Sequence, residues 1–251
     1  MSTLSLSDVS VRFGGLQALS EVSFDVDAGE IVGLIGPNGA GKTTVFNVIT
    51  GVYSPCNGKA SFDGQNLLGR RPHQVLALGV ARTFQNIRLF TNMTALENCM
   101  VAQHCRAKAG VVGAILHSPG QREEERRIAE AAMEALEFMG LDHVAHEVAQ
   151  NLSYGMQRRL EIARALAAWP TLILLDEPAA GMNPAESKQL MESIGRILER
   201  GVSVLMVEHD MKVVMGICRR IVVLDHGVMI SQGSPDEIQK DPKVIEAYLG
   251  Q

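Results

Sequence analysis

Apolar and polar positions alternate in the N-terminal part of the chain. Val22, Phe24 and Val26 alternate with polar residues, a pattern typical of a strand that is buried on one face. The dipeptide Asp63-Gly64 follows a short run at 59–62 and indicates a hairpin turn. Together these patterns predict an antiparallel β layer near the N-terminus.

A different pattern begins at Ile31. Short, continuously apolar segments are expected for strands that are covered on both faces of a sheet, and four of them occur, at Ile31–Ile35, 171–175, 202–207 and 221–224. Between two of these runs, the segment 185–200 places apolar residues at i, i+4, i+7 and i+8 from Leu190, which is helical spacing. Strand, helix and strand in this order predict parallel β-α-β units and therefore an α/β core.

The strand signal fades in the middle of the chain. Residues 121–139 show helical spacing of apolar side chains, and Glu123 and Arg127 are placed to pair at i,i+4 on a solvated helix face. We therefore predict a single α/β domain over 1–251 with a mixed β-sheet core, an N-terminal antiparallel β subdomain and an inserted helical subdomain. The core is assigned to 1–85 and 166–251, and the helical subdomain to 86–165.

Composition and charge narrow the class of protein. Hydrophobic residues make up 46% of the 251 residues, enough for a real core. The net charge of −5 argues against binding nucleic acid through general phosphate attraction, which needs a basic face. The sequence shows no signal-peptide pattern, and no apolar run approaches the roughly 20 residues of a membrane-spanning helix. The cysteines form no C-x-x-C pair, which favours free thiols in a reducing cytosol over a zinc or redox site; they are Cys56, Cys99, Cys105 and Cys218.

The segment after the first buried strand carries a complete phosphate-binding motif. Residues 36–43 read GPNGAGKT and match G-x-x-x-x-G-K-[ST], and an apolar helical segment follows at 45–49. Glycines let successive backbone N–H groups turn toward phosphate oxygens, and the helix N-terminus adds its positive dipole end. We expect Lys42 to bridge the β- and γ-phosphates of a nucleotide and Thr43 to give its hydroxyl to Mg²⁺. The nucleotide-binding residues predicted from this segment are Gly36, Pro37, Asn38, Gly39, Ala40, Gly41, Lys42, Thr43 and Thr44.

Two carboxylates end the buried strand at 171–175. Asp176 is placed to hold Mg²⁺ through water, and Glu177 is placed to accept a proton from the attacking water. An apolar strand that ends in Asp-Glu is often only a strand that meets solvent. Combined with a phosphate loop, it indicates a site that hydrolyses a nucleotide.

A more specific motif lies directly upstream of that strand. The segment 152–156, LSYGM, resembles the LSGGQ signature of the ABC ATPases, with Tyr154 and Met156 in place of the usual Gly and Gln. Ser153 is a suitable N-cap, and a loop that leads into a helix can form a second anion site. The resemblance implies that Ser153 and Gly155 bind the γ-phosphate of ATP held by a second protomer.

Other segments match this family in order along the chain. Gln85 resembles the Q-loop glutamine, which senses Mg²⁺ and touches the transmembrane partner, and His209 resembles the switch histidine that contacts the γ-phosphate. Residues 180–183 occupy the place of the D-loop, and Phe13 that of the aromatic residue that stacks on adenine. The resemblance thus implies ATP and Mg²⁺ as cofactors, Glu177, His209 and Gln85 as catalytic residues, and Thr43, Gln85 and Asp176 as metal-binding residues.

Within the family, the amino-acid sequences of several segments are similar to those of the ATPases of branched-chain amino acid importers. These segments are 79–85, 152–155, 177–184 and 207–211, and 104–121 resembles an insertion in one of that system's two ATPase subunits. The resemblance implies an ATP-hydrolysing motor subunit, cytoplasmic and peripheral on the inner face of the cell membrane. Its partners would be a second copy or a sister ATPase subunit, transmembrane permease subunits and, indirectly, a substrate-binding protein, with no nucleic acid.

A docking surface for the permease is expected beside Gln85. In the family, a groove there receives a short cytoplasmic helix of the permease. The residues Asn86, Arg88, Leu89 and Phe90 mix apolar anchors with a cation, a composition suited to such a groove. The alternative is that Leu89 and Phe90 fill the core of the helical subdomain.

Three other classes of protein are alternatives to an importer ATPase. Related ABC systems for urea, amides or lipids use very similar motors, so the sequence leaves the substrate open. A soluble ABC-type ATPase that acts on DNA or ribosomes would carry a long coiled coil before the signature or two cassettes in one chain, and the sequence has neither. A GTPase or a kinase would leave the signature at 152–156 unexplained.

Overall fold

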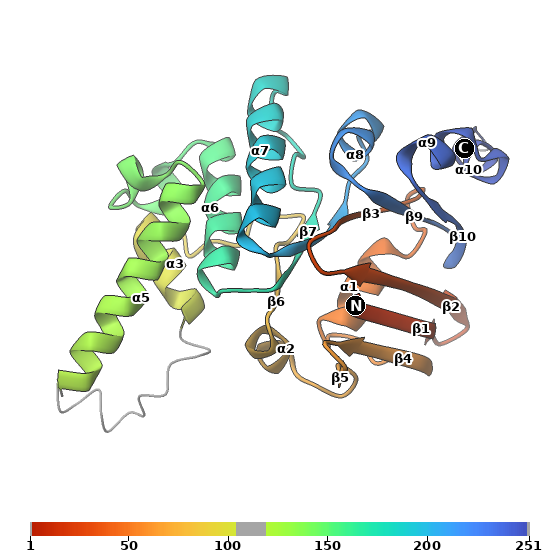
Figure 1. Ribbon diagram of the computed structural model, residues 1–251, viewed down its shortest axis with the longest axis horizontal. Helices are drawn as coiled ribbons and strands as arrows, with labels where there is room; N and C mark the ends of the chain where they lie inside the picture. The colour runs from red at the N-terminus through yellow and green to blue at the C-terminus, as the bar shows by residue number, and fades with distance from the viewer. Residues whose placement is uncertain (1, 104–118, 250–251) are drawn as a thin grey trace.

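The computed structural model describes residues 2–103 and 119–249, which form two β-sheets and a group of helices (Figure 1). In this view the helices α3, α5 and α6 lie at the left end of the molecule, and the antiparallel sheet lies toward the right, below the strands β3, β9 and β10 of the larger sheet. Cys105 and most of the segment 104–121 lie outside the described residues.

The smaller sheet is the antiparallel layer predicted from the N-terminal alternation. Its order is β2-β1-β4-β5, and its strands are β1 (Ser2–Phe13), β2 (Leu16–Asp27), β4 (Asn57–Phe62) and β5 (Gln65–Asn66). Val22, Phe24 and Val26 are buried, as their alternation predicts. Asp63 and Gly64 connect β4 to β5 with φ angles of 45° and 73°, which are the positive values that a tight hairpin turn requires. The predicted hairpin is therefore confirmed.

The larger sheet has the order β10-β9-β3-β8-β7-β6. Its strands are β3 (Ile31–Ile35), β6 (Val80–Arg82), β7 (Leu172–Asp176), β8 (Ser203–Val207), β9 (Arg220–Asp225) and β10 (Val228–Gly233). Five of them are parallel, and β10 runs antiparallel to β9, so the sheet is mixed as predicted. The four apolar runs are the strands β3, β7, β8 and β9.

Both faces of this sheet are covered, which explains the continuous apolar runs. Along β7, Leu172 and Leu174 belong to the core that contains α1 and the antiparallel sheet, whereas Ile173 and Leu175 belong to the core under the remaining helices. The helices are α1 (Lys42–Ile49), α2 (Pro72–Leu78), α3 (Ala95–Gln103), α5 (Pro119–Phe138), α6 (Tyr154–Ala167), α7 (Pro184–Ile197), α8 (Met211–Ile217), α9 (Pro235–Lys240) and α10 (Pro242–Leu249).

The middle of the chain is helical, as the loss of strand signal predicts. Ala132 and Leu136 of α5 are buried, and Glu123 pairs with Arg127 on its exposed side, with Nε and Oε1 3.2 Å apart. The boundary predicted at residue 165 falls inside α6, which continues to Ala167; the division into a core and a helical subdomain stays a prediction. Within the described ranges, no helix combines the length and apolar character needed to cross a membrane. Cys56, Cys99 and Cys218 are free thiols.

Candidate nucleotide-binding and catalytic site

The predicted phosphate loop connects β3 to α1, so the strand–loop–helix context expected from the sequence is present. At residue 36 a side chain would overlap the carbonyl oxygen of Leu224, and at residue 41 a Cβ would lie 2.7 Å from Leu19 Cδ2. Gly41 also has a φ of 105°, which favours glycine. Asn38 and Gly39 are exposed in the loop, Pro37 and Ala40 are buried, and Thr44 is half-buried in α1.

Lys42 begins α1 and folds back onto the loop that precedes it. Its ammonium donates hydrogen bonds to the carbonyl oxygens of Gly36, at 2.6 Å, and Pro37, at 2.9 Å. Burial lowers the pKa of Lys42 below its ordinary value, and the negative charges of Glu177 and Asp176 oppose this shift. The cation is therefore held inside the loop and in the field of the two predicted carboxylates.

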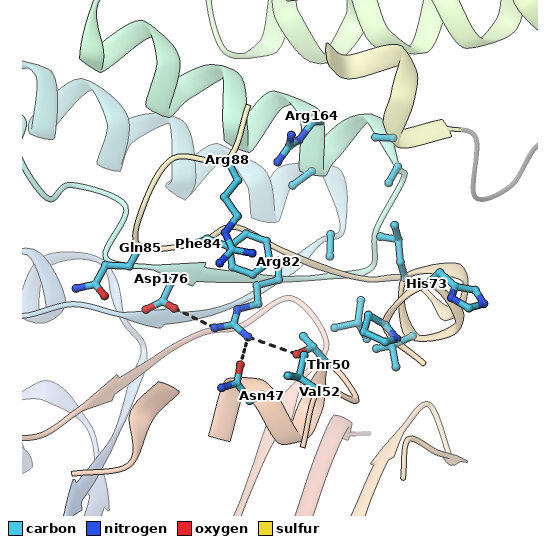
Figure 2. A pocket seen from close by; sticks show the side chains of 18 of the residues that line it. Asn47, Thr50, Val52, His73, Arg82, Phe84, Gln85, Arg88, Arg164 and Asp176 are labelled. Carbon is cyan, nitrogen blue, oxygen red and sulfur yellow. Dashed lines mark hydrogen bonds and ion pairs between the residues drawn. The ribbon is translucent and has the colours of Figure 1, made fainter. Parts of the chain in front are cut away.

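Asp176 ends β7 and forms a buried ion pair that the sequence analysis did not find. Its Oδ2 lies 3.2 Å from Nη2 of Arg82 on the neighbouring strand β6. The Arg82 guanidinium also donates to Asn47 Oδ1 at 2.7 Å (Figure 2) and lies over the rings of Phe46 and Phe84. Burial raises the pKa of Asp176, and the hydrogen bond and charge of Arg82 oppose this rise.

The three predicted catalytic residues meet at Glu177. Its Oε1 lies 2.6 Å from His209 Nε2, and its Oε2 accepts a hydrogen bond from Gln85 Nε2 at 3.0 Å. Both oxygens of the carboxylate therefore have partners. The backbone of Glu177 has a φ of 48°, which is uncommon for a residue with a side chain and concentrates at functional sites.

The three predicted metal-binding residues line one cavity of about 750 Å³. These residues, Thr43, Gln85 and Asp176, offer a hydroxyl, an amide and a carboxylate oxygen. Mg²⁺ prefers oxygen donors and is usually held by one or two protein groups together with water and substrate phosphates. The donor set therefore fits a magnesium ion that is bound together with a nucleotide.

The same cavity continues along the segment after Gln85 (Figure 2). Asn86, Arg88 and Phe90 line it, and Phe90 is 47% exposed. Leu89 packs against the core of buried residues that includes α3 and α6 instead. Leu89 is half-buried, so the alternative of packing against the helical core applies to Leu89 in part, whereas Phe90 is largely exposed.

The residues of the signature lie at the start of α6 and do not line this cavity. Ser153 is the N-cap, and its hydroxyl accepts the backbone N–H of Met156 at 3.4 Å. Gly155 is buried against α7, where an added Cβ would lie 2.9 Å from the carboxylate of Glu186. Phe13 ends β1 and is not among the residues that line the cavity; its ring meets the Tyr53 ring edge to face, with the ring centroids 5.0 Å apart.

A second buried ion pair fixes the backbone around Gln85. Arg158 and Glu161 of α6 pair at 3.0 Å, with side chains 1% and 0% exposed. Arg158 donates to the carbonyl oxygens of Phe84 and Gln85, each at 2.7 Å, and Glu161 Oε1 accepts the N–H groups of Phe84 and Arg88, each at 3.3 Å. This pair is not among the features predicted from the sequence. The signal that could have found it is that Arg158 lies on the same helical face as the apolar residues at 162 and 166.

Comparison with known proteins places this site in a family. A family profile described as ABC transporter matches residues 19–180, and one described as branched-chain amino acid ATP-binding cassette transporter matches residues 228–251. The chain is 46% identical over 249 residues to the high-affinity branched-chain amino acid transport ATP-binding protein LivG of Salmonella typhimurium, covering 99% of this chain and 98% of that protein.

Two solved structures show the same fold. The ADP conformation of MJ1267, an ATP-binding cassette of an ABC transporter, has a TM-score of 0.86 and 30% identity, with each chain covered completely. A dimeric post-hydrolysis state of the cassette MJ0796, bound to ADP and Pi, has a TM-score of 0.76 and 26% identity, covering 92% of this chain and 98% of that one. With a complete phosphate loop and a carboxylate cluster in place, the chain belongs to the ABC transporter family, as an ATP-binding cassette that hydrolyses ATP.

Proposed function

We propose that this chain is the ATP-hydrolysing motor subunit of an importer for branched-chain amino acids. The observation that carries the substrate class is the match of residues 228–251 to the branched-chain cassette profile, because this segment lies outside the residues that match the general ABC profile. The similarity to LivG, a high-affinity branched-chain amino acid transport ATP-binding protein, supports the same class. The chain would be cytoplasmic and peripheral, bound to permease subunits at the inner face of the membrane.

The proposed chemistry centres on Glu177. Its carboxylate accepts the proton of the water that attacks the γ-phosphate, while Lys42 and the phosphate loop bind the phosphates. In the present conformation His209 and Gln85 occupy both oxygens of Glu177. We infer that ATP binding draws these two side chains toward the γ-phosphate and frees one oxygen for the water.

Mg²⁺ belongs to the same proposal. Thr43 and Asp176 would hold the ion, with Gln85 as a further oxygen donor, and the bound ion would neutralise phosphate charge. Arg82 keeps the Asp176 carboxylate paired in its buried position, since each buried charge needs a partner. Asp176 therefore has a charged partner before a metal ion arrives.

We also propose that two protomers, either two copies or this chain and a sister subunit, complete each nucleotide site. Ser153 and Gly155 lie at the start of α6 and outside the cavity that Thr43, Gln85 and Asp176 line. An anion site at this helix start would thus serve a nucleotide bound by the other protomer, as the resemblance to the ABC ATPase signature implies. The dimeric state of the MJ0796 cassette supports such an arrangement.

A transport assay tests the proposed substrate. Deleting the gene is expected to abolish most high-affinity uptake of labelled leucine, isoleucine and valine in the source cell. The wild-type chain should restore uptake, whereas Lys42→Ala should not, because the phosphate loop loses its cation. Unchanged amino acid uptake together with a loss of urea or amide uptake, or a defect in lipid transport, would assign the chain to one of the related ABC systems instead.

The permease is proposed to dock in the cavity beside Gln85. Cationic side chains line this cavity. The lining also includes the carboxylate of Asp176, which is already paired with Arg82. Arg88 lies over the Phe84 ring at 4.3 Å, and Arg164 lies over the Phe90 ring at 5.9 Å. We therefore infer that the docking segment carries a carboxylate as well as apolar residues.

Removing the two exposed anchors of this cavity is expected to weaken complex formation. Arg88→Ala combined with Phe90→Ala should lower co-purification with the permease by roughly 30-fold or more, the effect of losing a central interface anchor. The ATPase activity of the isolated subunit should stay within about twofold. Met93→Ala is the matched control, because Met93 is 37% exposed in the same region but does not line the cavity. Loss of folding in the double variant would mean that the two residues are structural.

A further inference from the structure

The start of the signature helix contacts the loop that follows Glu177. The hydroxyl of Tyr154 donates a hydrogen bond to the carbonyl oxygen of Ala180 at 3.0 Å. The Tyr154 ring also covers Gly181, where an added Cβ would lie 3.0 Å from the ring atom Cε1. Gly181 has a φ of 77°, so this loop meets the ring at a position that favours glycine. The start of α6 also approaches α7 (both labelled in Figure 1), because an added Cβ at Gly155 would lie 2.9 Å from Glu186 Oε1.

The phenol of Tyr154 has a second partner on the opposite side. Nη2 of Arg158, one turn further along α6, lies 3.5 Å from the Tyr154 oxygen and donates to the carbonyl oxygen of Gln85 at 2.7 Å. A guanidinium can only donate, so the phenol oxygen accepts from Arg158 and directs its own proton toward Ala180. Tyr154 therefore connects the loop after Glu177 to the arginine that holds Gln85.

Ala180 in turn holds the backbone of Glu177. The N–H of Ala180 donates to the carbonyl oxygen of Glu177 at 3.1 Å, and the N–H of Glu177 donates to Val207 at 2.9 Å. Because Glu177 has a φ of 48°, its backbone conformation has to be maintained by its surroundings. The Tyr154 hydroxyl and ring are part of those surroundings, although Tyr154 itself lies outside the catalytic cluster.

We propose that Tyr154 is a positioning residue for Glu177, which it acts on through Ala180 and Gly181. The inference rests on the proposed role of Glu177 as the general base. Glycine, the usual residue at this position of the signature, has no side chain that could reach Ala180. In this chain the loop that carries the base is therefore joined to the signature helix by a side-chain contact, and a movement of α6 is transmitted to Glu177.

The test is a double-mutant cycle on the purified chain. Tyr154→Phe removes the hydroxyl and keeps the ring, and it is expected to lower the kcat for ATP hydrolysis by about 3- to 10-fold, the worth of one neutral hydrogen bond. The KM for ATP should not change, and the midpoint of thermal unfolding should fall by no more than about 2–4 °C, the shift that the loss of one hydrogen bond produces in a chain of this size. In a Glu177→Gln background the same substitution should cause no further loss of the residual rate, because its effect passes through Glu177.

Ser193→Ala is the matched control, since it removes a hydroxyl that donates to the carbonyl of Gln189 within α7, at 3.0 Å. It should leave kcat and KM unchanged. A Tyr154→Phe variant as active as Ser193→Ala, an effect on KM alone, or an equal loss in the Glu177→Gln background would each overturn the proposal. The single variant Glu177→Gln reports separately on the base: if it retains wild-type turnover, the proposed function of Glu177 fails, whatever Tyr154→Phe does.

Discussion

Replacing Glu177 by Gln is expected to lower the kcat for ATP hydrolysis by about 10²- to 10⁴-fold, the usual contribution of a positioned base. The amide keeps the shape of the side chain and can still accept one hydrogen bond, but it cannot take the proton of the attacking water. ATP binding should persist, because Lys42 and the phosphate loop are untouched. The variant should then accumulate as an ATP-bound dimer, detected by size-exclusion chromatography with bound nucleotide.

Glu208 offers a matched comparison, since it is a neighbouring carboxylate with a different environment. It is 5% exposed, and it accepts the N–H groups of Ala179 and His209 at 2.9 and 3.2 Å. Burial raises its pKa, which the hydrogen bonds from these two N–H groups oppose. Glu208→Gln should therefore reduce turnover far less than Glu177→Gln. A larger loss for Glu208→Gln, or near wild-type turnover for Glu177→Gln, would remove Glu177 as the base.

The parts of the fold that the sequence predicts are those set by local pattern. The runs that became β3, β7, β8 and β9 are almost entirely apolar because both faces of the sheet are covered. The alternation at Val22, Phe24 and Val26 reflects a sheet with one buried face. The short strand β6 has only three residues, too few for a period to be recognised, and it is therefore not predicted from the sequence.

The residues of the candidate site also divide into those that a local motif predicts and those that only the folded structure brings together. Residues inside contiguous motifs, such as Lys42 and Asp176, can be proposed from sequence because each motif fixes its own local geometry. Arg82 escaped detection because its partner Asp176 is 94 positions away, and only the pairing of β6 with β7 brings them together. The different environments of Leu89 and Phe90 could not be predicted for another reason: an irregular segment has no period that would separate a residue packed on the core from an exposed one.

Stability should depend strongly on the buried ion pair of the signature helix. Arg158 is fully buried, and Glu161→Ala leaves its guanidinium without a countercharge. Removing one member of a buried pair typically costs about 3–5 kcal/mol of unfolding free energy. The N–H groups of Phe84 and Arg88 also lose their acceptor, so the segment beside Gln85 should loosen. Urea denaturation of wild type and variant measures the difference.

The chain contains its own control for this experiment. Glu123 and Arg126 form another i,i+3 pair on a helix, with Nη2 and Oε1 2.7 Å apart, but their side chains are 43% and 63% exposed. Water screens this pair, and exposed ion pairs contribute little to stability. Glu123→Ala should therefore leave the urea midpoint within error, although it removes the same chemical group at the same helical spacing. If both substitutions shifted the midpoint equally, burial would not be what makes Arg158 depend on Glu161, and the anchoring of the Gln85 backbone by this pair would have to be abandoned.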